Sequence, residues 1–268
     1  MRAIIVIPAR YGSTRLPGKP LAKIAGKSLL ERTWSIAKAV QHIDGVYIAT
    51  DDERIKHHAE GFGAQVIMTP VDLPNGTERV FHAVSALPYT PDIILNLQGD
   101  AVLTPPWVIQ ALMDRMLADA TIGFATTAMR LSVEQYQQMA RSKQNGAVGG
   151  TTVVFDKQDN ALYFSKSLIP FMRQAPCDPL PVFRHIGLYV YRYDVLQQYL
   201  ALPPTELELT EGLEQLRALE HSIPIKVVQV DYRGRSHCAV DSQADIDYVE
   251  QLIAKEGELL AGLVGPLA

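Results

Sequence analysis

The chain has 268 residues, of which 47% are hydrophobic and 20% charged, and its formal net charge is −4. This composition is that of a globular protein and excludes wholesale disorder, and the acidic balance argues against non-specific nucleic-acid binding, which needs a basic surface. With only two cysteines, Cys177 and Cys238, a disulfide scaffold is excluded and a cytoplasmic setting is expected. No apolar run approaches the ~20 residues of a membrane span, so we expect none.

The first half of the chain alternates short apolar runs with helical patterns. Strands are predicted over 3–7, 45–50, 65–68 and 93–97. Helices are predicted from Ser28, where Glu31 offers a capping box, and over 52–62 and 77–85. This alternation implies a parallel sheet, and ligands of such sheets bind beyond the carboxyl ends of the strands.

The second half is less regular. Its predicted strands cover 122–129, 151–155, 161–164, 187–191 and 225–230. One helix is predicted over 206–219, with Leu209, Leu213 and Leu216 on its core face, and a closing helix contains Ile246, Val249, Leu252 and Ile253. We interpret residues 1–268 as a single domain with an inserted subregion at about 130–205.

The segment 8–20 follows the first strand and holds three cations, Arg10, Arg15 and Lys19. Glycine lets the backbone approach a ligand closely, and backbone N–H groups with Arg and Lys can cradle an anion. The alternative is a solvated, positively charged turn. Neither a Walker motif nor GxGxxG is present, which disfavours a nicotinamide dehydrogenase.

Two carboxylates follow apolar segments further along the chain. Asp100 comes after the strand at 93–97, and Asp241 precedes the closing helix. Such a pair could hold Mg²⁺ together with phosphate oxygens and water. The alternative for each is a helix N-cap.

Two further polar groups could bind a substrate. The turn Asn75-Gly76-Thr77 leads into a helix whose N-terminus suits a base or ribose, although Thr77 could simply be a helix cap. Period-two alternation places His185, Gly187 and Tyr189 on one strand face, with Glu214 and Gln215 downstream. Together they could bind a polyhydroxylated acceptor, or they could be satisfied core residues.

A series of short motifs occurs in a fixed order over about residues 3–253. They are the loop at 8–20, Ala49-Thr50-Asp51, Asn75-Gly76-Thr77-Glu78-Arg79, Leu97-Gln98-Gly99-Asp100, Ala161-Leu162-Tyr163-Phe164-Ser165, Arg184-His185-Ile186-Gly187-Leu188-Tyr189, Leu213-Glu214-Gln215-Leu216-Arg217 and Val240-Asp241. In this order the motifs resemble a known family, the 3-deoxy-manno-octulosonate cytidylyltransferases (CMP-Kdo synthetases).

The resemblance implies a Rossmann-like α/β fold of the nucleotide-diphospho-sugar transferase type, with a mostly parallel sheet, helices on both faces and a homodimeric assembly. It implies that CTP and a 3-deoxy-ulosonic acid give the CMP-sugar and pyrophosphate, in lipopolysaccharide synthesis. Mg²⁺ would bind Asp100 and Asp241, which with Arg15 and Lys19 form the catalytic set. Nucleotide contacts would fall on Ala9, Arg10, Ser13, Lys19, Gly76, Thr77, Arg79 and Gln98. Acceptor contacts would fall on Gln98, His185, Tyr189, Glu214 and Gln215.

Several positions depart from the family pattern. Ala101 and Val102 follow Asp100 where the family has Glu-Pro, a glycine-rich 145–152 replaces an Asn-x-Val-Lys pattern, and Lys166 replaces an Arg. Asp241 is followed by Ser-Gln-Ala where the family has Thr-Pro-Glu. Lys is not equivalent to a bidentate Arg, so 8-amino-Kdo or another ulosonic acid is an alternative acceptor. A catalytically silent nucleotide-binding relative is a further alternative. Ile186, Leu188 and Val190 could form either a core face or a dimer contact.

Overall fold

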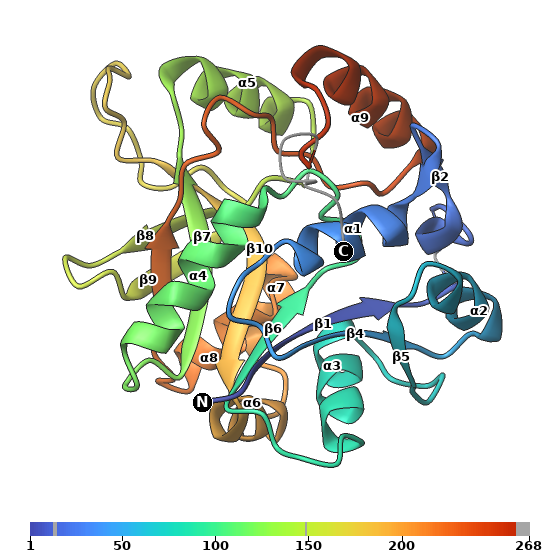
Figure 1. The fold of residues 1–268 in the computed structure, drawn as a ribbon. Coiled ribbons are helices and arrows are strands. Elements are labelled where there is room, and N and C mark those ends of the chain that lie inside the picture. The colour runs from blue at the N-terminus through green and yellow to red at the C-terminus, as the bar shows by residue number, and fades with distance from the viewer. Residues whose placement is uncertain (13–14, 148, 261–268) are drawn as a thin grey trace. The chain divides into compact units, whose positions relative to one another are not determined.

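The computed structural model describes residues 1–12, 15–147 and 149–260 (Figure 1). The chain divides into two compact units, one made of 1–113 with 232–268 and one of 114–231. The subregion expected at about 130–205 lies inside the second unit. Each unit has its own strands and helices.

The first unit is built on a parallel sheet. Its strands lie in the order β6 (Ile93–Leu97), β1 (Ala3–Ala9), β4 (Gly45–Thr50) and β5 (Gln65–Met68). The central strand β1 is apolar and buried almost throughout, as parallel strands covered on both faces are. All four strands were predicted from their apolar runs, and the α/β class is confirmed.

Helices cover this sheet from two sides. Figure 1 shows α1 (Leu29–Lys38) and α3 (Gly76–Ser85) on opposite sides of β1 and β4. Next to β5 lies α2 (Glu53–Gly61), and the short elements η1 (Lys19–Leu21), β2 (Lys23–Ile24) and β3 (Lys27–Ser28) precede α1. As predicted, Ser28 caps α1: its hydroxyl accepts a hydrogen bond from the Glu31 N–H at 3.0 Å.

The closing helix α9 (Gln243–Glu256) packs back onto the first unit through an apolar cluster. Val249 and Leu252 of α9 meet Leu103 and Val240 there, together with Ile24, Leu29, Val102 and Ile246. Burial of several such side chains stabilises the fold by about 1.5–3 kcal/mol each. The cluster therefore fixes the backbone beside both predicted carboxylates.

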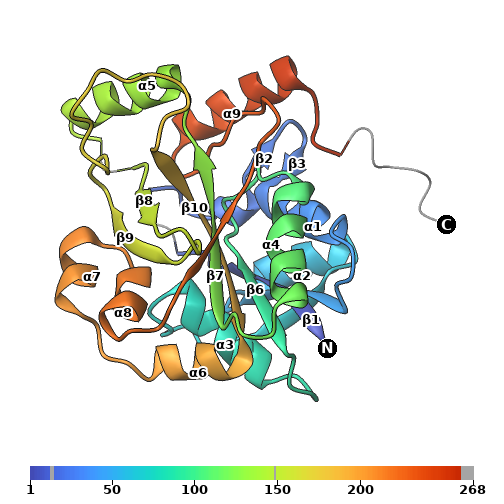
Figure 2. The same cartoon turned by 90° about the vertical axis from the view of Figure 1, so that its left-hand side faces the viewer.

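The second unit is mainly antiparallel. Its strand β7 (Phe124–Arg130) pairs in parallel with β11 (Lys226–Gln229) and antiparallel with β10 (Phe183–Arg192). On the other edge of β10 lies β8 (Thr152–Phe155), which pairs with β9 (Ala161–Ser165). Figure 2 shows α7 (Glu206–Glu211) and α8 (Gln215–Glu220) next to β9. Ile186, Leu188 and Val190 are buried within the chain and belong to its core.

The prediction of a single helix over 206–219 is wrong. The chain forms α7 and α8 instead, and Gly212 between them has a left-handed conformation with φ +61° that a continuous helix does not allow. Leu213 and Leu216 are buried as expected, but Leu209 is 72% exposed. The break rotates the two halves, so leucines at helical spacing no longer share one face.

Three helices were not predicted: α4 (Pro106–Ala118), α5 (Val133–Gln144) and α6 (Tyr193–Leu200). In α4 apolar residues occur on nearly every face, so no amphipathic period marks it. In α5 the only buried residue is Met139, so the apolar stripe that marks most surface helices is missing. The fold of both is decided by packing and by capping, including a capping box between Ser132 and Gln135.

Candidate functional site

A pocket of about 380 Å³ opens in the first unit, and residues that follow β1 and β6 line it. This is the edge at which parallel sheets bind ligands. Nine predicted site residues line it: Ala9, Arg10, Arg15, Lys19, Gly76, Arg79, Gln98, Asp100 and Asp241. Thr77 lies buried beside it, and Ser13 lies outside the described residues.

Lys19 connects the two predicted carboxylates. Its Nζ lies 3.1 Å from Asp100 Oδ2 and 3.1 Å from Asp241 Oδ1, and donates to the Val240 carbonyl at 2.9 Å. The guanidinium of Arg15 lies 3.1 Å from Asp241 Oδ2. Residues more than 200 positions apart in the sequence thus form one network of alternating charge.

A backbone hydrogen bond explains why Asp100 and Asp241 both reach Lys19. The Val240 N–H donates to the Asp100 carbonyl at 3.4 Å, and Val240 is completely buried in the cluster below α9. Neither aspartate caps a helix. The N-cap of α9 is Ser242, in a capping box with Asp245, and α4 begins only at Pro106. The alternative of simple helix caps is therefore wrong for both carboxylates.

Gly99 allows the strand end next to Asp100 to approach β1. A Cβ atom on Gly99 would lie 3.1 Å from the Pro8 carbonyl oxygen, tighter than ordinary contact. This close approach puts Asp100 beside the cationic loop that follows Pro8.

Arg79 is buried at one side of the pocket and is held in place by three groups. Its NH2 lies 3.3 Å from Asp51 Oδ2, and its NH1 donates to the Thr69 hydroxyl and to the Pro70 carbonyl at 3.3 Å. The second oxygen of Asp51 is buried, and no described residue donates a hydrogen bond to it. Asp51 directly follows the strand predicted over 45–50 but was given no role from the sequence, and Thr69, the other side-chain partner of Arg79, was missed.

A short relay of amides orients Gln98. Its Nε2 donates to Asn96 Oδ1 at 3.1 Å, and Asn96 Nδ2 donates to the Thr77 hydroxyl at 3.3 Å. Thr77 is not the cap of α3, because Asn75 accepts from the Glu78 N–H at 2.8 Å. Asn96 was missed, although a fully buried amide within an apolar strand is a signal that sequence reasoning can use.

In the second unit, His185, Tyr189 and Gln215 are in contact and buried. The ring centroids of His185 and Tyr189 are 5.6 Å apart, and the Tyr189 hydroxyl donates a hydrogen bond to Gln215 Oε1 at 3.1 Å. Burial raises the pKa of Tyr189 well above its usual value, and the charge of Glu214 adds to this. Gln215 Nε2 is buried and has no hydrogen-bond acceptor in the part of the chain that the structure describes. Gly187 is exposed instead of sharing this face, because β10 is irregular between Ile186 and Tyr189.

His185 is a neutral imidazole with a defined tautomer. Burial lowers its pKa to about 3. The Thr126 hydroxyl donates to the Leu188 carbonyl at 2.7 Å, so its oxygen accepts from His185 Nε2 at 2.8 Å. This hydrogen-bond pattern assigns the proton to Nε2 and leaves Nδ1 as an acceptor.

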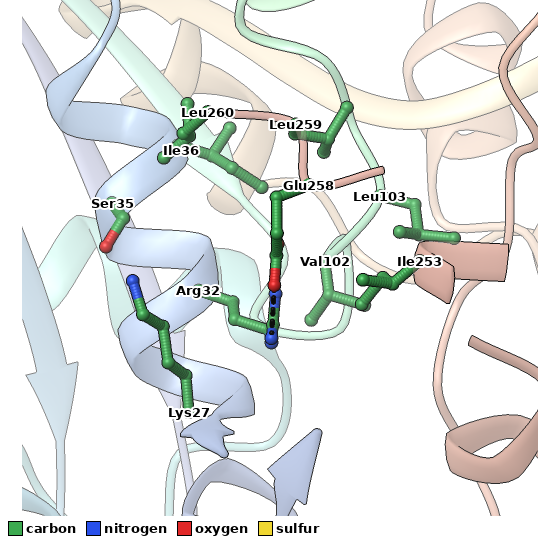
Figure 3. A pocket seen from close by; sticks show the side chains of 10 residues that line it. All are labelled: Lys27, Arg32, Ser35, Ile36, Val102, Leu103, Ile253, Glu258, Leu259 and Leu260. Atoms are coloured by element: carbon green, nitrogen blue, oxygen red, sulfur yellow. Dashed lines mark hydrogen bonds and ion pairs between the residues drawn. The ribbon is translucent and has the colours of Figure 1, made fainter. Parts of the chain in front are cut away.

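A second pocket of about 250 Å³ in the first unit has a different chemistry (Figure 3). Figure 3 shows Glu258 facing Arg32 across it, among apolar side chains such as Val102 and Leu103. Arg32 donates to both carboxylate oxygens of Glu258, at 2.8 and 3.0 Å, and this hydrogen bonding lowers the pKa of Glu258. Because Glu258 pairs with Arg32 and Lys27 is the other charged residue of a mainly apolar lining, this pocket is less suited to a polyphosphate than the first.

No group of three or more His, Cys, Asp or Glu side chains suited to a metal occurs among the residues the structure describes. A cation at Asp100 and Asp241 would therefore need further ligands from a substrate or from water. In the described part of the chain, no helix is long and apolar enough to cross a membrane.

Comparison with known proteins finds cytidylyltransferases. A family model described as Cytidylyltransferase matches residues 4–226. A 3-deoxy-manno-octulosonate cytidylyltransferase from Maricaulis maris is 52% identical over 97% of this chain and 100% of its own length. An 8-amino-3,8-dideoxy-manno-octulosonate cytidylyltransferase from a Shewanella species is 39% identical over 95% of this chain and 99% of its own length.

Solved structures agree with these relatives. A CMP:2-keto-3-deoxy-manno-octonic acid synthetase complexed with CTP has a TM-score of 0.84 and is 36% identical, covering 96% of this chain and 100% of that one. A cytidylyltransferase from Leptospira borgpetersenii, 16% identical over 95% of this chain and 88% of that one with a TM-score of 0.61, shares the fold. The extent of these matches shows that this chain belongs to the cytidylyltransferase family, within its 3-deoxy-manno-octulosonate (CMP-Kdo synthetase) group.

Proposed function

We propose that this chain transfers CMP from CTP to 3-deoxy-manno-octulosonate (Kdo), releasing pyrophosphate, as a step of lipopolysaccharide synthesis. The observation that carries the proposal is the network in the first unit, in which Lys19 of the cationic segment 8–20 lies between Asp100 and Asp241. A pocket with this charge pattern suits a triphosphate. The solved relative complexed with CTP supports CTP as the nucleotide.

In this proposal the pocket binds the nucleotide in two parts. Arg10, Arg15 and Lys19 neutralise the triphosphate, because N–H donors that carry charge form the stronger hydrogen bonds to phosphate. Gly76, Thr77 and Arg79, at the N-terminus of α3, contact the base and ribose, and Ala9 and Ser13 add contacts from the loop. Gln98, oriented by Asn96, contacts both nucleotide and acceptor.

Asp100 and Asp241 fit a divalent cation of the Mg²⁺ type. They already converge on one cation, the Lys19 ammonium, and they offer only oxygen ligands. Mg²⁺ usually binds one or two carboxylates and takes its other ligands from phosphate and water. When bound there, the ion would neutralise charge on the triphosphate and polarise the reacting phosphorus.

The reaction is an in-line displacement. The anomeric hydroxyl oxygen of the acceptor forms a bond to the α-phosphorus of CTP and loses its proton, while the bond to the bridging oxygen breaks and pyrophosphate leaves. The residues mainly position the reactants and neutralise charge. Arg15 and Lys19 stabilise the leaving pyrophosphate as its charge grows.

The acceptor is proposed to contact Gln98, His185, Tyr189, Glu214 and Gln215. Nε2 of the buried Gln215 supports this assignment, because no described residue accepts a hydrogen bond from it and such a donor is expected to find an acceptor in a ligand. The neutral His185 and the protonated Tyr189 suit a polyhydroxylated molecule, since they bind hydroxyl groups without adding charge.

A second candidate is the same reaction on 8-amino-Kdo. Relatives with that name are 39% identical to this chain, and Lys166 departs from the family pattern. Two other departures have structural explanations: Val102, after Ala101, belongs to the cluster below α9, and the Thr152 hydroxyl donates to the Ser167 carbonyl at 2.7 Å.

Pyrophosphate release tests the proposal. The purified chain would be incubated with CTP and Mg²⁺ and with Kdo, 8-amino-Kdo or other 3-deoxy-ulosonic acids. We expect fast release with Kdo. Faster release with 8-amino-Kdo would establish the second candidate. No release with any acid, while CTP binds, would reject both and favour a silent nucleotide-binding relative.

A homodimer and a cytoplasmic location are also proposed. Two large apolar side chains in the region 150–200 are exposed, Leu162 at 62% and Phe171 at 90%, which supports a contact between copies there. Light scattering after size-exclusion chromatography would test the dimer. Neither cysteine forms a disulfide, which agrees with a reducing compartment.

A further inference from the structure

Lys143, in the last turn of α5, has a buried ammonium group. Its Nζ is shielded from water, and no described residue accepts a hydrogen bond from it. An ammonium group has three donors, and burying it without acceptors is unfavourable. A compensating group is therefore expected at this position.

The surroundings of Lys143 are mostly positive. Burial is the largest cause that lowers its pKa, and the charge of Lys166 lowers it further. The carboxylate of Glu211 raises it, and the guanidinium of Arg184 lowers it. Helix α5, the residue after β9 and strand β10 thus bring three cations near the carboxylate of Glu211.

That carboxylate is already engaged. Glu211 Oε1 accepts from the Ser165 hydroxyl at 2.6 Å, and Oε2 accepts from the Lys166 N–H at 2.9 Å. The Lys166 ammonium lies beside Gly212, where a Cβ atom would be only 3.3 Å from its Nζ. The glycine keeps space next to this second ammonium, and Glu211 leaves Lys143 unpaired.

We propose that Lys143, Lys166 and Arg184 form a binding site for an oxyanion, and that its ligand in the working enzyme is the carboxylate of the acceptor acid. A carboxylate has two oxygens that accept several hydrogen bonds each and would neutralise part of the excess positive charge. The assignment of the ligand rests on the proposed function. The site itself rests only on the geometry of the second unit.

The position of the cluster in the sequence favours the acceptor over another anion. Glu211, the carboxylate beside the cluster, lies four residues before Gln215, and its helix α7 contacts α8. Gln215 Nε2 and Lys143 Nζ are both buried donors for which no described residue provides an acceptor. One sugar acid, with hydroxyls and a carboxylate, offers acceptors of both kinds.

The test compares Lys143→Met with Lys157→Met, which removes an exposed lysine from the same unit. For Lys143→Met we expect the KM for the acceptor acid to rise about tenfold or more, the usual effect of losing one charged hydrogen bond. The KM for CTP should stay as in the wild type, and the melting temperature of the ligand-free protein should not fall, because the substitution removes an ammonium group that is unfavourable to bury. Lys157→Met should change none of these values.

Two further measurements separate the sources of the anion. An acceptor analogue with its carboxylate reduced to an alcohol should be used equally poorly by the wild type and by Lys143→Met. If the acceptor KM is unchanged in Lys143→Met but stabilisation by inorganic phosphate is lost, the carboxylate assignment is overturned and a free anion is the ligand. If neither property changes, the whole site is rejected.

The outcome remains distinguishable from failure of the proposed function. If the wild type releases no pyrophosphate with any acid, the proposed function has failed. The phosphate titration, followed by the melting temperature of the wild type and of Lys143→Met, then decides the anion site without any turnover. Equal stabilisation of both proteins by phosphate would reject it.

Discussion

The two units place their candidate residues in opposite physical environments. In the first unit Arg15, Lys19, Asp100 and Asp241 are partly exposed and form ion pairs at 3.1 Å. In the second unit His185 and Tyr189 are buried and neutral, and hydrogen bonds hold them. In the proposed function, ionic groups of the first unit bind the triphosphate, whereas buried neutral groups of the second unit bind the hydroxyl groups of the acceptor.

The largest effect is expected when the ionic network of the first unit loses a carboxylate. Asp100→Asn removes one of the two carboxylates and should lower turnover by on the order of 10³-fold, as losing a charge-stabilising group does. Pyrophosphate release measures this, and the melting temperature should change little because Asp100 is not a helix cap. The exposed Asp247→Asn in α9 is the matched control and should be fully active. Near-normal activity of Asp100→Asn would show that the carboxylate pair is not the catalytic centre.

The next largest effect is the pH dependence of stability caused by the buried His185 of the second unit. His185 has a pKa of about 3 in the folded chain against 6.5 when unfolded, so below pH 6.5 the unfolded chain binds the extra proton. Stability from this group is complete above pH 6.5 and is lost as the pH falls towards 3. Between pH 7 and pH 5 the loss should be about 2 kcal/mol.

Urea unfolding at pH 7 and pH 5 measures this loss, and His185→Gln should abolish that part of the difference. A variant with the same pH dependence as the wild type would mean that His185 is not buried as a neutral ring.

A smaller effect is expected from the ion pair between Asp51 and Arg79 in the first unit. Asp51 does not line the pocket but pairs with Arg79, so Asp51→Asn should raise the KM for CTP about tenfold through a displaced guanidinium. The value of kcat should change less, since Asp51 contacts no reacting atom. Steady-state kinetics with varied CTP would show this. An effect on kcat alone would contradict a positioning role.

The smallest effect concerns one neutral hydrogen bond. Tyr189→Phe removes the hydroxyl that donates to Gln215 at 3.1 Å and should cost about 1 kcal/mol of stability. The KM for the acceptor should rise several-fold, while the KM for CTP should not move. If both KM values rose together, the separation of nucleotide and acceptor residues would be wrong.

Sequence patterns were enough to predict the four parallel strands of the first unit, three of its helices and the types of residue at its strand ends. Long apolar runs such as β1 admit only a buried strand, and Ser28 can be recognised as a helix cap from its neighbours. The ordered motifs were sufficient to identify the family. The roles of the individual site residues stay predictions.

Tertiary contacts determine which distant residues come together, and they also form elements that have no local sequence signature. Asp241 reaches Lys19 because α9 packs onto a cluster that contains Val240, and no local pattern encodes that contact. In the same way α5 has almost no apolar stripe, and Gly212 ends α7 where leucine spacing predicted a continuous helix. The buried ammonium of Lys143 likewise depends on neighbours from other elements. Periodicity reports one segment at a time, whereas burial and pairing depend on segments that are distant in the chain.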